Sequence, residues 1–110
     1  MPAQERQHMS HLSFNRICQE IERELEKAFR KFPSFPVDPI HAQSVMGEEA
    51  GETLQAALQA VYEGGSLEKV RGEAIQTAAM CLRLIHGIDS GLVRLEGDGT
   101  EDQLGDKNES

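Results

Sequence analysis

The chain has 110 residues and a mass of 12.2 kDa, which suits one domain and excludes a two-domain enzyme within one polypeptide. Aromatic residues make up 5% of it and Trp is missing, a composition that favours a helical protein over a β-sandwich. The net charge of −8 excludes a basic nucleic-acid-binding domain. No apolar run approaches the roughly 20 residues that cross a bilayer, and no signal segment begins the chain. We therefore expect no nucleic acid or membrane partner and a cytoplasmic location.

Apolar residues first recur with helical spacing at positions 14, 17, 18, 21, 25, 28 and 29, which predicts an amphipathic helix over about residues 13–31. Ser10 or Ser13 is a suitable N-cap, and Pro33 disfavours helix at the residue before it. Cys18 lies on this helix, and Cys81 lies in a later apolar stretch. We expect both cysteines to be buried and reduced.

Two further helices follow the proline-containing connector 32–37. Asp38 followed by Pro39 is a strong helix start, and this second helix is expected to reach about Glu63, before two glycines. Ser66 then caps a third helix over about residues 67–86, which is expected to stop around Gly87 and Gly91.

The composition divides the chain into a flexible leader, residues 1–12, a single all-α domain, residues 13–95, and a disordered acidic tail, residues 96–110. The tail holds six acidic residues and one lysine. It has too little apolar surface to offset the entropy of ordering its backbone.

Three helices of these lengths form a long, thin unit with little interior. Such a monomer leaves apolar stripes exposed to water. The expected fold is therefore an all-α, antiparallel helical bundle that is completed by oligomerisation, as a homodimer or a homotetramer.

The second helix carries an unusual group of acids. Glu48, Glu49 and Glu52 lie within one turn, and residues 32–68 contain no lysine or arginine. Residues 50, 54, 57, 58 and 61 form an apolar face on the other side of this helix. One interpretation is a solvated acidic face. The other is a site for a hard cation, because carboxylate oxygens on adjacent turns suit Mg²⁺ or Mn²⁺.

The third helix offers a second contribution, because Glu73 and Gln76 lie at the edge of its apolar arc, where an antiparallel second helix can meet them. Glu48-Glu49-x-x-Glu52, a spacer, then Glu73-x-x-Gln76 resembles the MazG-like all-α nucleoside triphosphate pyrophosphohydrolases, whose pattern is EExxE followed by ExxD. The similarity covers about residues 30–88. The family's aspartate is replaced by Gln76, whose amide adds no charge.

The resemblance implies Mg²⁺-dependent hydrolysis, with Mn²⁺ as a substitute, of a nucleoside or deoxynucleoside triphosphate between its α and β phosphates. The products are the monophosphate and pyrophosphate. The implied metal ligands are Glu48, Glu49, Glu52, Glu73 and Gln76. Glu48 or Glu49 is then the residue that orients or deprotonates the attacking water.

Weaker candidates for substrate binding flank these motifs. Phe35, with Lys31 nearby, has the chemistry to stack on a base, although core packing explains Phe35 and the helix dipole explains Lys31. Lys69 and Arg83 have the charge to contact phosphate, although a solvated surface position is the favoured explanation of each.

Two other functions compete with the hydrolase. A non-catalytic helical dimerisation or adaptor module would use the same acidic patch to bind a basic partner. A di-iron carboxylate bundle requires Glu-x-x-His pairs, and neither motif supplies one.

Overall fold

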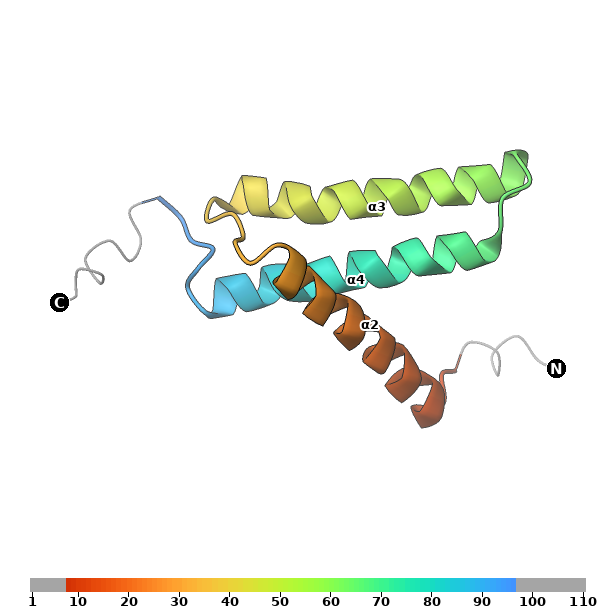
Figure 1. Ribbon diagram of the computed structural model, residues 1–110, viewed down its shortest axis with the longest axis horizontal. Coiled ribbons are helices and arrows are strands. Elements are labelled where there is room, and N and C mark those ends of the chain that lie inside the picture. Colours follow the sequence, from red (N-terminus) through yellow and green to blue (C-terminus); the bar gives the residue numbers. More distant parts are fainter. Residues whose placement is uncertain (1–7, 97–110) are drawn as a thin grey trace.

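The computed structural model describes residues 8–96, which form three helices and no strand. These are α2 (His11–Lys31), α3 (Pro39–Tyr62) and α4 (Leu67–Asp89) (Figure 1). The predicted all-α class is confirmed. Most of the expected leader and tail lies outside the described residues, but His11 and Leu12, the last two residues of the expected leader, begin α2.

Each helix begins at a polar side chain that satisfies a free backbone N–H. The Ser10 hydroxyl accepts from the Ser13 N–H at 3.1 Å, so Ser10 is the N-cap of α2. Asp38 accepts from the His41 N–H at 2.8 Å, and Ser66 accepts from the Lys69 N–H at 3.1 Å. The caps predicted for α3 and α4 are therefore confirmed.

The end of α4 lies later than predicted. The helix passes through Gly87 to Asp89, and the chain turns only at Gly91, whose φ of +81° lies in the left-handed region. Gly87 lies inside the helix, and because it has no side chain it leaves room for Val93, which folds back against it.

Helices α3 and α4 lie side by side and antiparallel, joined by a short turn at residues 63–66, while α2 crosses α4 diagonally (Figure 1). Within residues 8–96, α2 contacts α4 but not α3. The part of α2 that is close to the N-terminus therefore diverges from the other two helices.

Small side chains fill the contact between α3 and α4. Ala42, Ala56 and Ala79 are almost completely buried. The larger residues of the predicted apolar face of α3 are open to water instead, with Leu54, Leu58 and Val61 exposed by 49–72%. Alanines allow two helix backbones to approach closely, and this approach turns the leucine face of α3 away from α4.

The core is small and lies where the connector, the start of α3 and the end of α4 meet. Phe35, Ala42 and Val93 are buried there, and Val45 and Leu84 pack against them. The Arg94 N–H donates to the Val37 carbonyl at 3.0 Å and closes this end of the fold.

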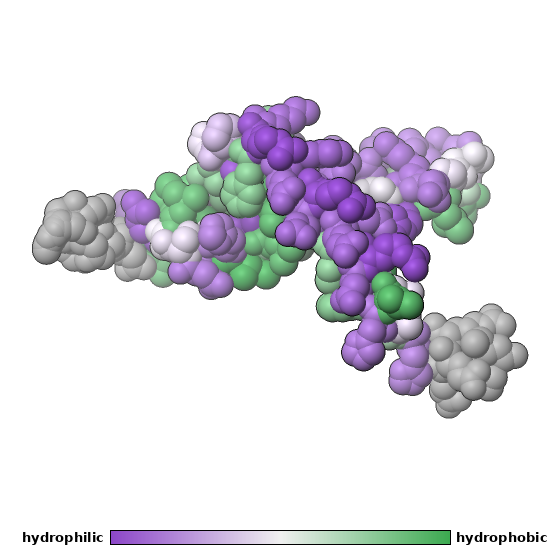
Figure 2. All heavy atoms as spheres, turned by 60° about the horizontal axis from the view of Figure 1, so that its bottom comes forward, coloured by the Kyte–Doolittle hydropathy of each residue, from purple (hydrophilic) through white to green (hydrophobic). Residues whose placement is uncertain are grey.

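The rest of the surface divides into polar and apolar regions. Figure 2 shows hydrophilic side chains along the face of α2 that is turned to the viewer and hydrophobic ones near the end of α4. No residue of α2 is buried, and Cys18 is exposed, so its expected burial is wrong; Cys81 is half-buried, and both thiols are free. None of the helices in residues 8–96 has the length and apolarity needed to cross a bilayer.

The surroundings of two glycines of α4 predict opposite effects on stability when each is replaced by alanine. A Cβ at Gly87 would lie 2.7 Å from Cγ2 of Val93, whereas a Cβ at Gly72 meets nothing within 4 Å. Gly72→Ala should therefore stabilise the fold by roughly 0.5–1 kcal/mol through helix propensity. Gly87→Ala should destabilise it by about 1 kcal/mol or more, because overpacking exceeds that gain. Thermal unfolding of both variants tests this, and a higher Tm for Gly87→Ala would show that Val93 does not pack as described.

Candidate metal centre

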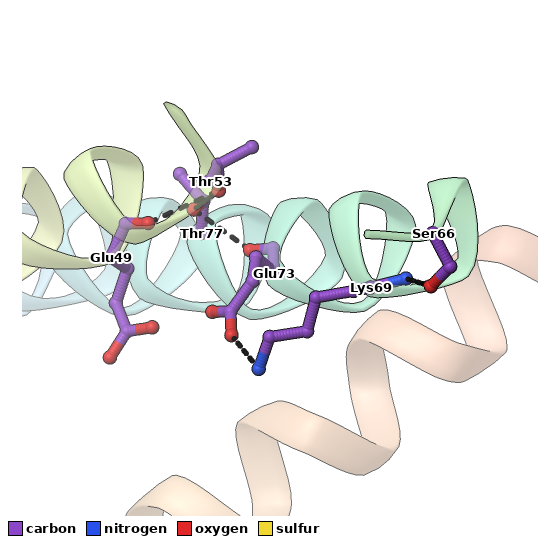
Figure 3. Close-up of polar contacts among 6 residues, drawn as sticks. All are labelled: Glu49, Thr53, Ser66, Lys69, Glu73 and Thr77. Carbon is purple, nitrogen blue, oxygen red and sulfur yellow. Dashed lines mark hydrogen bonds and ion pairs between the residues drawn. The ribbon is translucent and has the colours of Figure 1, made fainter. Parts of the chain in front are cut away.

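Three carboxylates meet across the contact between α3 and α4. Glu49 and Glu52 lie one turn apart on α3, and Glu73 lies on α4. Each offers one oxygen, and these three oxygens all lie within 4.8 Å of one another. We call these residues the carboxylate cluster. Figure 3 shows the Glu49 and Glu73 carboxyl groups pointing to the same side of the two helices.

Burial decreases across the cluster. Glu73 is only 9% exposed, Glu49 is half-buried and Glu52 is exposed. Burial raises the pKa of Glu49, and the nearby charges of Glu52, Glu73 and Glu48 raise it further. The cluster thus has a buried floor and one side open to water.

The oxygens of the cluster are short of hydrogen-bond donors. Oε1 of Glu49 and Oε1 of Glu73 are both buried, and neither has a hydrogen-bond partner. A buried carboxylate oxygen without a donor is costly unless a cation or water satisfies it. The donor set is oxygen only, with room for further ligands on the open side, which fits Mg²⁺ or Mn²⁺.

One lysine partly neutralises the cluster. Nζ of Lys69 lies 2.9 Å from Oε2 of Glu73, one turn along α4 (Figure 3). The hydrogen bond to Glu73, together with the Glu73 charge, raises the pKa of Lys69. Lys69 therefore lies beside the carboxylate cluster.

A pair of threonines joins the two helices beside the cluster. The Thr53 and Thr77 hydroxyl oxygens are 3.0 Å apart. Each also lies close to the backbone carbonyl of a cluster residue one turn earlier, Thr53 at 3.1 Å from Glu49 and Thr77 at 3.0 Å from Glu73. Two hydroxyl protons serve these three contacts, so the threonines form one shared hydrogen-bond network (Figure 3).

The sequence reasoning missed this pair, although a signal was present. Glu49-x-x-x-Thr53 on α3 and Glu73-x-x-x-Thr77 on α4 have the same spacing. A threonine one helical turn after a glutamate can donate its hydroxyl proton to the backbone carbonyl of that glutamate. The repeated spacing marks where antiparallel helices can meet with matching polar groups.

Two of the predicted ligands lie outside the cluster. Glu48 is exposed, but its charge acts on Glu49. Gln76 is exposed and lines a depression of about 180 Å³ between α2 and α4, together with residues such as Glu20, Arg23 and Arg71. The structure thus brings together three of the five predicted ligands: Glu49, Glu52 and Glu73.

Arg83 is buried, so the interpretation that places it on the solvated surface is wrong. It is 3% exposed, and its guanidinium donates to the Ala28, Phe32 and Ser34 carbonyls at the end of α2. The guanidinium carbon also lies 4.5 Å from the Phe29 ring centre and 4.9 Å from that of Phe35. Burial lowers the pKa of Arg83. Arg83 thereby fixes the end of α2 against α4.

The other two weak candidates are at the same end of the fold. Phe35 belongs to the core, which agrees with the interpretation that it packs in the interior. Lys31 is exposed, with its Nζ 5.5 Å from the ring centre of Phe32.

The comparisons with known proteins give no relative. No protein-family model matches the chain, and no match was found among curated proteins or among solved structures.

The threonine network predicts a coupled effect on stability. Thr53→Val and Thr77→Val should each lower the free energy of unfolding by about 1 kcal/mol, the usual contribution of one hydrogen bond. The double variant should be less destabilised than the sum of the two, with a coupling of about 0.5 kcal/mol or more. Denaturant unfolding of the four proteins measures this, and strictly additive losses would show that the hydroxyls do not interact.

Proposed function

We propose that the protein is a Mg²⁺-dependent hydrolase that cleaves a nucleoside or deoxynucleoside triphosphate into the monophosphate and pyrophosphate. The observation that carries the proposal is the convergence of Glu49, Glu52 and Glu73 within 4.8 Å, with buried oxygens that lack donors. The likeness of the Glu48–Glu52 and Glu73–Gln76 segments to the motifs of MazG-like pyrophosphohydrolases supplies the reaction.

The charge of the protein requires a cation for this substrate. The whole chain has a net charge of −8, and the cluster itself repels phosphate. Divalent metal at the cluster would neutralise phosphate oxygens, lower the pKa of a coordinated water and stabilise charge that develops on the attacked phosphorus. A triphosphate thereby becomes an acceptable ligand for an acidic surface.

We assign different roles to the carboxylates. Glu73 and Glu49 form the buried floor of the site and Glu52 its open edge, so these three hold the metal. Glu48 lies outside the ligand group yet close enough to act on the charge of Glu49. It is therefore the free carboxylate that orients or deprotonates water, the role that the motif assigned to Glu48 or Glu49.

Gln76 replaces the family's aspartate in this scheme. Its position at the depression between α2 and α4 places an uncharged amide there. The proposal therefore depends on three carboxylates for charge, and the amide of Gln76 supplies at most a neutral oxygen.

The cluster predicts a loss of activity without a loss of folding. With Mg²⁺ or Mn²⁺, the protein should release pyrophosphate from at least one triphosphate, and a chelator should stop the reaction. Glu49→Gln, Glu52→Gln and Glu73→Gln should each lower the rate by more than about tenfold, or ~1.4 kcal/mol of transition-state stabilisation. Removing one like charge from Glu49 or Glu52 should leave Tm unchanged or higher when metal is absent.

Glu63→Gln is the matched control, because Glu63 is exposed and lies at the far end of α3. It should be nearly silent. Equal losses in all four variants would indicate general destabilisation, and release of orthophosphate would contradict cleavage between the α and β phosphates. If neither turnover nor Mg²⁺ binding occurs, the adaptor function replaces the hydrolase.

We also propose that the protein works as a homodimer or homotetramer in which a second copy covers the leucine face of α3. Leu54, Leu58 and Val61 are exposed along one side of this helix. No residue of α2 is buried within the described chain, so one copy buries only the small core around Phe35 and the alanines between α3 and α4. A continuous apolar stripe of this kind gains stability when an identical stripe covers it.

Sedimentation velocity tests this assembly. The wild type should sediment as a dimer or tetramer at micromolar concentration, and Leu58→Glu should shift it towards monomer because it buries a charge in the interface. Gln59→Glu adds the same charge about 100–160° around α3 from the three residues of the leucine face, and it should leave the assembly intact. A wild type that stays a compact monomer would contradict the proposal.

A further inference from the structure

We propose that Lys69 is an exchangeable counter-cation of the carboxylate cluster: it occupies Glu73 until a divalent cation arrives, and it then turns to the phosphates that the cation carries. This inference rests on the proposed metal site and adds a residue that links metal binding to substrate binding.

Lys69 already contacts one oxygen of the cluster. The ammonium of Lys69 lies 2.9 Å from Oε2 of Glu73, and the other oxygen of the same carboxyl group is buried without a donor. The pairing thus leaves half of the Glu73 carboxylate unsatisfied. A divalent cation held by Glu73, Glu49 and Glu52 would bring a second positive charge to the carboxyl group that the ammonium already contacts, and the two cations would repel each other.

Lys69 combines a fixed backbone with an exposed side chain. The backbone of Lys69 is fixed, because its N–H donates to the Ser66 hydroxyl at the start of α4. Its side chain, in contrast, is 62% exposed, while that of Glu73 is 11% exposed. An ammonium on a flexible four-carbon stem exchanges partners at little energetic cost. Once displaced, Lys69 stays tethered at the rim of the cluster.

The Lys69–Glu73 pair differs from an ordinary ion pair within a helix. Lys27 and Glu24 on α2 are also close, at 3.1 Å, and the Lys27 side chain is exposed to the same degree, 65%. Glu24 is not part of the carboxylate cluster, whereas Glu73 is its most buried member. Lys27 thus provides the chemistry of Lys69 without the neighbouring carboxylates.

The exchange predicts effects of opposite sign for two ligands. Without the Lys69 charge, a bare divalent cation meets no competitor and should bind more tightly. A cation that carries a triphosphate should bind less tightly, because the released ammonium no longer contacts the phosphates. A purely structural lysine would weaken both ligands or neither.

The experiment uses the full chain and the variants Lys69→Met and Lys27→Met, with circular dichroism to verify that each is folded. Calorimetry measures binding of Mn²⁺ alone and, in excess Mn²⁺, of inorganic tripolyphosphate. Lys69→Met should bind Mn²⁺ about two- to fivefold more tightly, the range expected for an exposed ion pair. It should bind tripolyphosphate in excess Mn²⁺ more weakly by at least about twofold. Lys27→Met should match the wild type in both.

The outcomes separate this inference from the proposed function. If the wild type binds Mn²⁺ and Lys69→Met binds it equally or more weakly, the exchange is wrong and the metal site stands. If Lys69→Met binds both ligands more tightly, the contact with phosphate is wrong. If neither protein binds Mn²⁺, the metal site itself is overturned and the inference falls with it. An equal change in Lys27→Met would show a general charge effect and also overturn the inference.

Discussion

The fold must hold three carboxylates within 4.8 Å of one another at the contact between two helices. Two unit charges at about 4 Å repel each other by roughly 1 kcal/mol in water and by more where water is excluded. Several features offset this repulsion: the ammonium of Lys69 next to Glu73, the shared hydroxyl network of Thr53 and Thr77, and the close approach of small residues along α3 and α4. Burial, and after it the charges of Glu52, Glu73 and Glu48, raise the pKa of Glu49, so its ionised form remains costly. That residual cost is what binding of a divalent cation would remove.

The same constraint accounts for the small core. Because α3 turns its alanines, Glu49 and Thr53 towards α4, it cannot also turn Leu54 and Leu58 there, since these lie on a different side of the helix. The leucine face is left for another surface, and we assign a second copy to it. Arg83 has a parallel role at the other interface, where its buried guanidinium replaces apolar packing and fixes the end of α2 through backbone carbonyls. Polar groups therefore order both helix contacts.

The sequence predicted local structure well and packing partners poorly. Asp38-Pro39 and Ser66 gave correct helix starts because a cap depends only on a few neighbouring residues. The helical wheel placed Glu48, Glu49 and Glu52 on one side of α3 and placed Glu73 and Gln76 at the edge of the apolar arc of α4. The structure brings three of these five residues together: Glu49, Glu52 and Glu73. The wheel did not reveal which face of α3 meets α4, since periodicity defines faces but not their partners. The burial of Arg83 and the exposure of Cys18 depend on where α2 crosses α4, and long-range docking of this kind has no local sequence signal.

The central claim is that Glu49, Glu52 and Glu73 bind one divalent cation. Crystals of the protein grown with Mn²⁺ and measured near the manganese absorption edge test it most directly, because the anomalous signal locates the ion independently of the protein atoms. Our account predicts an anomalous peak in contact with oxygens of all three glutamates, with the Lys69 ammonium moved away from Glu73. A peak elsewhere, or a cluster that keeps its Lys69–Glu73 pair and shows no peak in saturating Mn²⁺, would contradict it.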